Sequence, residues 1–101
     1  MIKSGAHRIA PREIEEILLE HPAVHEAAVV GVPDEILGEA IAAFISARTK
    51  EPLNEREILD WCRRRLPSHK VPGLLRVIEE FERNAAGKIN KLGLAKSLGD
   101  R

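Results

Sequence analysis

The chain has 101 residues, of which 16 are Lys or Arg and 16 are Asp or Glu, and it holds one cysteine. This length predicts a single domain over residues 1–101, and the balanced charge excludes strong electrostatic steering towards nucleic acid or an anionic membrane surface. A lone cysteine excludes an intrachain disulfide, and no apolar run approaches the ~20 residues of a membrane span, so a cytoplasmic protein without a membrane span is expected.

Turn and cap residues divide the sequence into a hairpin, three helices and three further strands. Gly5 permits a tight turn, and Pro11 suits the first turn of a helix. Asn54, with Glu57 three residues later, resembles a capping box. Between these turn and cap residues, apolar residues recur at helical spacing or form nearly continuous runs. The expected elements are a hairpin at 1–9, helices at 11–20, 55–66 and 91–98, and strands at 24–32, 41–46 and 74–78.

The order of these elements indicates the fold class. The first two apolar runs are joined by an eight-residue loop at 31–38 that contains the turn signal Pro33-Asp34, which favours adjacent antiparallel strands. Long parallel crossovers are not expected between the strands. The sequence therefore predicts an α+β fold: a small three-stranded antiparallel sheet with helices packed on one face, plus a short N-terminal hairpin.

Lys88 is the first candidate for chemistry. It follows Ala85, Ala86 and Gly87 on a turn whose side chains are too small to block an approaching molecule. An ammonium group in this position suits a phosphate or a carboxylate charge that develops in a reaction, and the turn's backbone amides could face the same anion. The alternative is an ordinary solvated surface lysine, and the spacing by itself does not decide between them.

The N-terminal hairpin is the second candidate. Lys3, Ser4, Gly5, Ala6 and Arg8 combine two cations, a hydroxyl and a flexible glycine, which suits the lip of a site for a phosphorylated ligand. The alternative is a plain polar hairpin turn.

Other residue types point away from metal and nucleic-acid sites. The four histidines lack metal-ligand spacing, so no metal site is expected in this chain. The run at 63–65 is basic, but the chain has too few aromatic residues to stack bases, so a solvated helix face and no nucleic-acid partner are expected. Cys62 falls in an apolar stripe, which favours a packing role over a nucleophile.

Several short motifs in a fixed order resemble the C-terminal domain of adenylate-forming enzymes, the AMP-binding group that includes acyl-CoA synthetases, adenylation domains and luciferases. The resemblance covers nearly the whole chain. Its motifs are Met1–Gly5 with Ile9–Glu15, His21–Val24, Gly31–Asp34 with Gly38-Glu39, Lys70–Pro72 and Gly87–Ile89.

The resemblance implies a two-step ligase reaction. A carboxylate attacks ATP to give an acyl-adenylate and pyrophosphate, and the thiol of CoA or of a carrier protein's phosphopantetheine then displaces AMP. ATP with its Mg²⁺ is implied to bind mainly to a large N-terminal adenylation domain that is absent from this sequence. Gly87 and Lys88 match the nucleotide- and substrate-binding motif, which implies that Lys88 is the catalytic adenylation lysine.

The same resemblance implies a role for the hairpin in the second step. Lys3, Ser4, Gly5, Ala6 and Arg8 match the segment that lines the pantetheine tunnel once the C-terminal domain, a mobile lid, has rotated. Many family members have two glycines where this chain has Gly5-Ala6, and the choice between CoA and a carrier protein stays open.

Two hypotheses follow for the whole chain. In the first it is the mobile part of an acyl-activating ligase, inactive alone because one lysine and a hairpin do not enclose ATP and an acyl group. In the second it is a free-standing, non-catalytic module that docks on a carrier protein or a partner enzyme. The identity of the carboxylic acid, the oligomeric state and any regulation by lysine acetylation are left open by the sequence.

Overall fold

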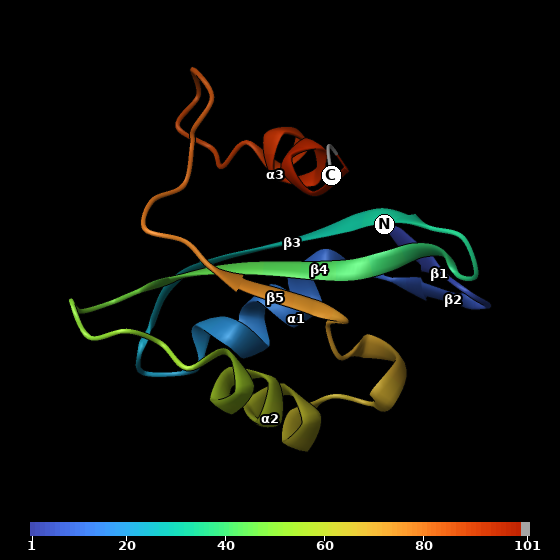
Figure 1. Ribbon diagram of the computed structural model, residues 1–101, viewed down its shortest axis with the longest axis horizontal. Helices are drawn as coiled ribbons and strands as arrows, with labels where there is room; N and C mark the ends of the chain where they lie inside the picture. Colours follow the sequence, from blue (N-terminus) through green and yellow to red (C-terminus); the bar gives the residue numbers. More distant parts are fainter. Residues whose placement is uncertain (100–101) are drawn as a thin grey trace.

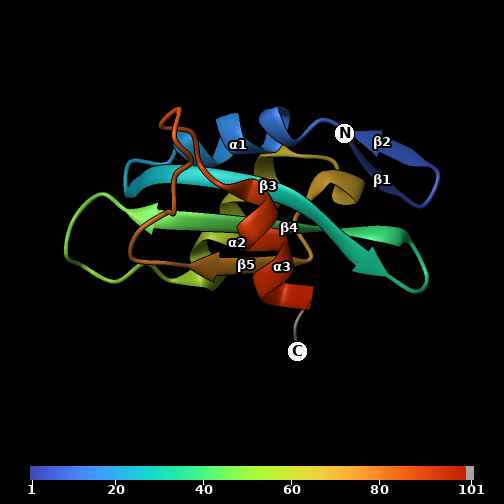
Figure 2. The same cartoon turned by 90° about the horizontal axis from the view of Figure 1, so that it is seen from above.

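The computed structural model describes residues 1–99 and consists of one twisted sheet with helices on both faces (Figure 1). The elements in chain order are β1 (Ile2–Ser4), β2 (His7–Ile9), α1 (Pro11–Leu19), β3 (Val24–Asp34), β4 (Gly38–Ala47), α2 (Glu55–Arg65), the 3₁₀ helix η1 (Ser68–Lys70), β5 (Leu74–Val77) and α3 (Lys91–Gly99). Helices α1 and α2 cover one face, and α3 lies over the other. Figure 2 shows that α3 runs across the strands rather than along them.

The central strand β4 organises the sheet. One of its edges pairs antiparallel with β3 along the full length of both strands. The other edge is shared: β1 pairs antiparallel with it at Ser4↔Gly38, and β5 pairs parallel with residues 42–45. The N-terminal hairpin and β5 therefore occupy successive parts of the same edge.

The α+β class is confirmed, while two details of the predicted sheet were wrong. The sheet has five strands because the hairpin joins it through β1, whereas three strands and a separate hairpin were expected. Strand β5 is parallel to β4 because the connection at 48–73 carries α2 and is long enough to act as a crossover. The β3–β4 connection is also shorter than expected, since the strands extend to Asp34 and from Gly38.

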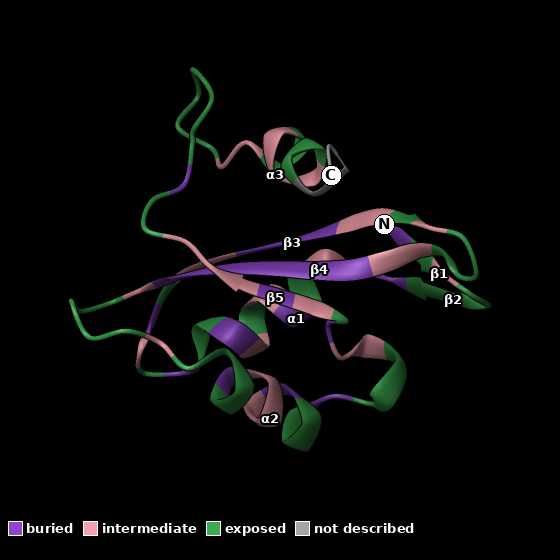
Figure 3. Ribbon diagram, in the orientation of Figure 1, coloured by how far each residue is buried: buried purple, intermediate pink, exposed green. Residues whose placement is uncertain are grey.

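Apolar residues on β3 and β4 alternate between two cores, one on each face of the sheet. Val29 and Ile45 face α1 and α2, while Ala28 and Phe44 face α3 and the segment that leads to it. Burial on both faces explains why these strands read as nearly continuous apolar runs (Figure 3). The expectation that helices cover only one face was wrong, because Leu94 of α3 packs on the second core.

The helices begin where the sequence predicts. Pro11 is the first residue of α1, and the Asn54 side chain caps α2 by accepting from the Arg56 and Glu57 amides at 2.9 and 3.2 Å. Trp61 ties the two helices together by donating from its indole nitrogen to the Ile17 carbonyl at 2.9 Å. Within residues 1–99, the structure has no helix long and apolar enough to cross a membrane.

Candidate functional site

Residues 83–89 form a small loop that stands away from the sheet (Figure 1), and Lys88 belongs to this loop. The base of the loop is closed by a bridge between Arg83 and Ile89. Within it the Asn84 amide donates to the Lys88 carbonyl at 2.8 Å, and the Gly87 amide donates to the Asn84 carbonyl at 2.9 Å. The loop is thus a defined turn and not an extended linker.

The Asn84 side chain fixes the turn from inside. Its Oδ1 accepts from the Ala86 amide at 2.9 Å and from the Lys88 amide at 3.1 Å. Gly87 has a φ of 81°, a left-handed conformation that favours glycine, although a Cβ there would meet no atom within 4 Å. Gly87 is therefore needed for its backbone conformation and not for space. Because Asn84 holds the amides of residues 86–88, the group that this loop offers to an anion is the Lys88 ammonium.

The loop is exposed while both of its flanks are anchored. Residues 82–88 are exposed, as Figure 3 shows in green, and among residues 1–99 no carboxylate pairs with Lys88. Phe81 before the loop is 5% exposed, and Ile89 after it packs on the same apolar core. Lys88 is therefore exposed to solvent on a loop whose two ends are fixed to the apolar core.

The N-terminal hairpin is built into the sheet. Lys3 and Arg8 are cross-strand partners, so both exposed cations project from the same face of the hairpin. Gly5 has a φ of 61°, and its amide donates to the Leu37 carbonyl at 2.8 Å. The Lys3 amide donates to a Glu39 carboxylate oxygen at 2.9 Å. Ser4 is half-buried, and Gly5 and Ala6 form the exposed tip of the turn.

A hollow of about 260 Å³ lies between the hairpin and the η1–β5 segment. His7 and His69 stack at this hollow, with ring centroids 4.0 Å apart. Loss of water around the ring, followed by the neighbouring His7 and Lys70, lowers the pKa of His69, and Glu13 opposes that shift. No group of three metal-ligating side chains occurs in the described part of the chain.

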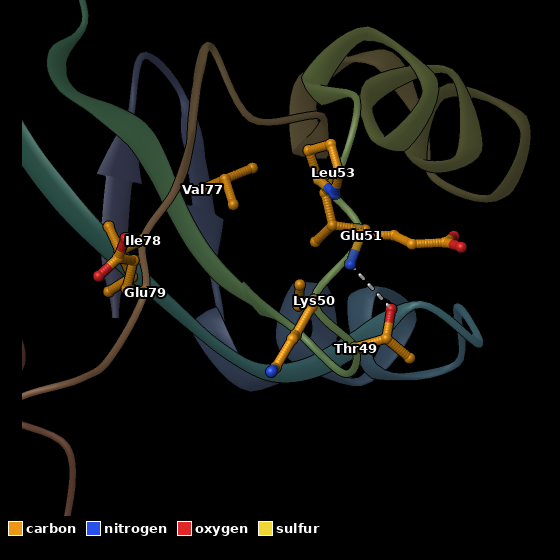
Figure 4. Close-up of a pocket in the computed structure, with 9 residues that line it drawn as sticks. Thr49, Lys50, Glu51, Leu53, Val77, Ile78 and Glu79 are labelled. Atoms are coloured by element: carbon orange, nitrogen blue, oxygen red, sulfur yellow. Dashed lines mark hydrogen bonds between the residues drawn. The ribbon is translucent and has the colours of Figure 1, made fainter.

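The structure does not bring the two predicted regions together. Figure 1 shows the Lys88 loop and the β1–β2 hairpin at opposite ends of the molecule. A second hollow, of about 510 Å³, lies between the β4–α2 connection and the end of β5, and Figure 4 shows its lining from Thr49 to Leu53 and from Val77 to Glu79. It contains none of the predicted site residues.

The remaining candidates have structural roles. Cys62 is buried, and burial raises the pKa of its thiol, which disfavours the nucleophilic thiolate. In the basic run, Arg63 pairs with Asp60 at 2.7 Å, and the guanidinium of Arg65 lies 3.2 Å from the centre of the Trp61 ring. These contacts agree with the predicted packing role and solvated helix face.

Sequence reasoning missed two residues of the Lys88 loop, Asn84 and Arg83. Asn84 could have been found, because an asparagine three residues before a glycine is a common first residue of a side-chain-capped turn. Arg83 pairs with Glu26 on β3, a contact that no local pattern predicts.

Comparison with known proteins gives a consistent result. The sequence profile of the AMP-binding enzyme C-terminal domain matches residues 13–88. The chain is 38% identical over 98 residues to the mitochondrial malonate–CoA ligase of Bos taurus, which covers 97% of the chain and 17% of that enzyme. It is 42% identical over 94 residues to the sulfoacetate–CoA ligase of Cupriavidus necator, covering 93% of the chain and 18% of the enzyme.

Solved structures agree with the sequence matches. The fatty acyl CoA synthetase of Mycobacterium tuberculosis superimposes with a TM-score of 0.89 at 37% identity. That superposition covers 99% of the chain and 20% of the synthetase. The chain therefore spans about a fifth of the length of the relatives it matches.

Proposed function

The chain belongs to the AMP-binding enzyme C-terminal domain family, and on this premise we propose that it is the mobile lid of an ATP-dependent, AMP-forming acid–thiol ligase. Its CoA-ligase relatives support the general use of ATP and CoA. The carboxylic acid and the nucleotide would bind mainly to a large N-terminal adenylation domain. Among residues 1–99 no cluster of metal-ligating side chains fits Mg²⁺, so no step of this domain's chemistry is assigned to the metal.

Lys88 is the catalytic residue of the first step in this proposal. A carboxylate oxygen forms a bond to the α-phosphorus of ATP, the bond to the bridging oxygen breaks, and pyrophosphate leaves with the electron pair. Negative charge spreads over the α-phosphate and the attacking carboxylate as this occurs. An ammonium fixed beside these oxygens stabilises that charge. The observation that carries this role is the exposed Lys88 ammonium on a loop that Gly87 and Asn84 hold in one conformation.

The hairpin serves the second step in this proposal. Here the thiol loses its proton to solvent and its sulfur bonds to the acyl carbon of the adenylate, while the bond from that carbon to the phosphate oxygen breaks and AMP leaves with the electron pair. Lys3 and Arg8, side by side across β1 and β2, suit the phosphate groups of CoA or of a phosphopantetheine arm. Ser4, Gly5 and Ala6 form the turn along which the arm would pass, and the hollow of about 260 Å³ beside Ser4 and Gly5 supports this location.

The separation of the two regions supports domain alternation. The Lys88 loop and the hairpin lie at opposite ends of the molecule, so the domain would turn to present Lys88 first and the hairpin second. The proposed partners are the N-terminal adenylation domain and either CoA or a carrier protein. The proposed compartment is the cytoplasm, which a fluorescent fusion of the full-length enzyme would test.

The test is Lys88→Ala in the full-length enzyme, measured as carboxylate-dependent ATP–pyrophosphate exchange. We expect a loss of about 100-fold or more, the usual effect of removing one group that stabilises developing charge. Lys96→Ala, which removes an exposed lysine of α3, is the matched control and should keep wild-type exchange. Wild-type exchange in Lys88→Ala would overturn the assignment. The purified 101-residue chain should show no ligase turnover of its own.

A further inference from the structure

Arg83 connects the Lys88 loop to the sheet. Its Nη1 donates to the Gly87 carbonyl at 3.0 Å, directly before Lys88 in the chain. Its Nη2 pairs with the Glu26 carboxylate on β3. One guanidinium thus contacts both the tip of the loop and the body of the domain.

Glu26 is itself fixed. It lies on β3 next to a register shift in the β3–β4 ladder, and its amide donates to Ser46 Oγ at 3.2 Å. Ser46 is 4% exposed and belongs to the central strand. A continuous series of contacts therefore runs from buried Ser46 through Glu26 and Arg83 to the peptide group between Gly87 and Lys88.

The other contacts of the loop hold its shape but not its direction. The bonds to Asn84 join residues 84–88 to one another, and the base is anchored through Phe81 and Ile89. Among residues 1–99, one polar contact links residues 83–88 to a strand of the sheet. This contact is the ion pair between Arg83 and Glu26. Without it the turn keeps its internal bonds and can tilt about its base.

We propose that Arg83, held by Glu26, is a positioning residue that sets where the Lys88 ammonium lies during adenylation. This inference rests on the proposed function of Lys88. An arginine suits the task because its planar group directs N–H donors to two acceptors at once, whereas a lysine offers a single point charge. Displacement of a catalytic group by about 1 Å can cost up to 100-fold in rate, so a tilt of the loop is enough to matter.

The experiment measures the adenylation half-reaction of the full-length enzyme with Arg83→Ala, Arg83→Lys and Glu26→Gln. We expect kcat to fall about tenfold in Arg83→Ala while KM for ATP and for the carboxylate stays within about twofold, because a misplaced Lys88 affects the transition state more than substrate binding. Arg83→Lys and Glu26→Gln should give smaller falls in kcat of the same kind.

Arg63→Ala is the matched control. It breaks a more exposed arginine–carboxylate pair, on α2, and should leave adenylation unchanged. Unchanged kcat in Arg83→Ala would overturn the proposal, as would a rise in KM that accounts for the whole loss.

Combination with Lys88→Ala separates positioning from an independent role. If Arg83 acts through Lys88, then Arg83→Ala adds no further loss to Lys88→Ala. A tenfold additional loss would contradict the proposal and leave the function of Lys88 intact. A Lys88→Ala variant that adenylates normally would instead contradict the proposed function, so the two failures are distinguishable.

Discussion

The Lys88 loop and the N-terminal hairpin are both short turns with a left-handed glycine, yet they are held in different ways. The hairpin is part of the sheet: Ile2 and Ile9 are 3% and 1% exposed in the main core. The loop is held by Asn84 and Arg83, through hydrogen bonds and one partly exposed ion pair. Apolar burial stabilises the first region, and polar contacts orient the second.

Because of this difference, mutations in the hairpin and mutations in the loop should affect different properties of the protein. A change in the buried strands of the hairpin disturbs the core that the whole domain shares, whereas a change in the loop alters the position of one ammonium group. In the proposed reaction the domain turns as a body, which suits a hairpin rigidly joined to the sheet. The loop needs a fixed tip but contributes little to folding.

The largest expected effect is on the stability of the hairpin. Ile9→Ala should lower the free energy of unfolding of the 101-residue chain by about 3 kcal/mol, because it removes a buried side chain and leaves a cavity. Lys88→Ala should change it by less than about 0.5 kcal/mol, since Lys88 is exposed. Urea denaturation followed by circular dichroism measures both. Equal losses would show that the loop is as much a part of the core as the hairpin.

A smaller and local effect is expected in the loop. Asn84→Ala removes the side-chain acceptor for two amides and should lower the protection of the Ala86 and Lys88 amides against hydrogen exchange by about 1 kcal/mol. Global stability should not change. Asn54→Ala is the matched control, because its side chain also accepts from two amides but caps α2, so it should lower global stability by about 1 kcal/mol. A global loss in Asn84→Ala would contradict the distinction between the two regions.

The smallest expected effect is a pH dependence at the hairpin. Loss of water around the ring, His7 and Lys70 lower the pKa of His69 in the folded state, so folding favours its neutral form. The unfolded chain binds the proton first, and the stabilisation present above about pH 6.5 is lost as the pH falls through the folded-state pKa. His69→Gln should therefore show a weaker decline in stability than the wild type as the pH falls below about 6.5. An unchanged decline would show that the stack does not influence folding.

The sequence predicts local elements well and their pairing less well. Pro11 and Asn54 act on their own neighbours, so the starts of α1 and α2 could be predicted from the chain alone. The direction of β5 depends on which edge of β4 is open after the crossover through α2, and an apolar run looks the same in parallel and antiparallel pairs. The position of α3 likewise depends on the second core, which forms only when the sheet is assembled.

The same distinction between local features and long-range contacts applies to the candidate site. The small residues before Lys88 predict an accessible lysine, and the order of motifs along the chain indicates its family. The contact between Arg83 and Glu26 joins positions 57 residues apart, and no spacing rule links them. The stack of His7 on His69 also joins distant segments, so it becomes visible only in the folded chain.

The most direct test of the proposed separation compares both half-reactions in two variants of the full-length enzyme. Single-turnover rates of adenylation, and of thiol transfer from supplied acyl-adenylate, are measured for Lys88→Ala and Arg8→Ala. We predict that Lys88→Ala slows adenylation about 100-fold and transfer far less, while Arg8→Ala slows transfer about tenfold through one lost phosphate contact and leaves adenylation unchanged. Equal losses in both half-reactions, in either variant, would contradict the assignment of the two regions to separate steps.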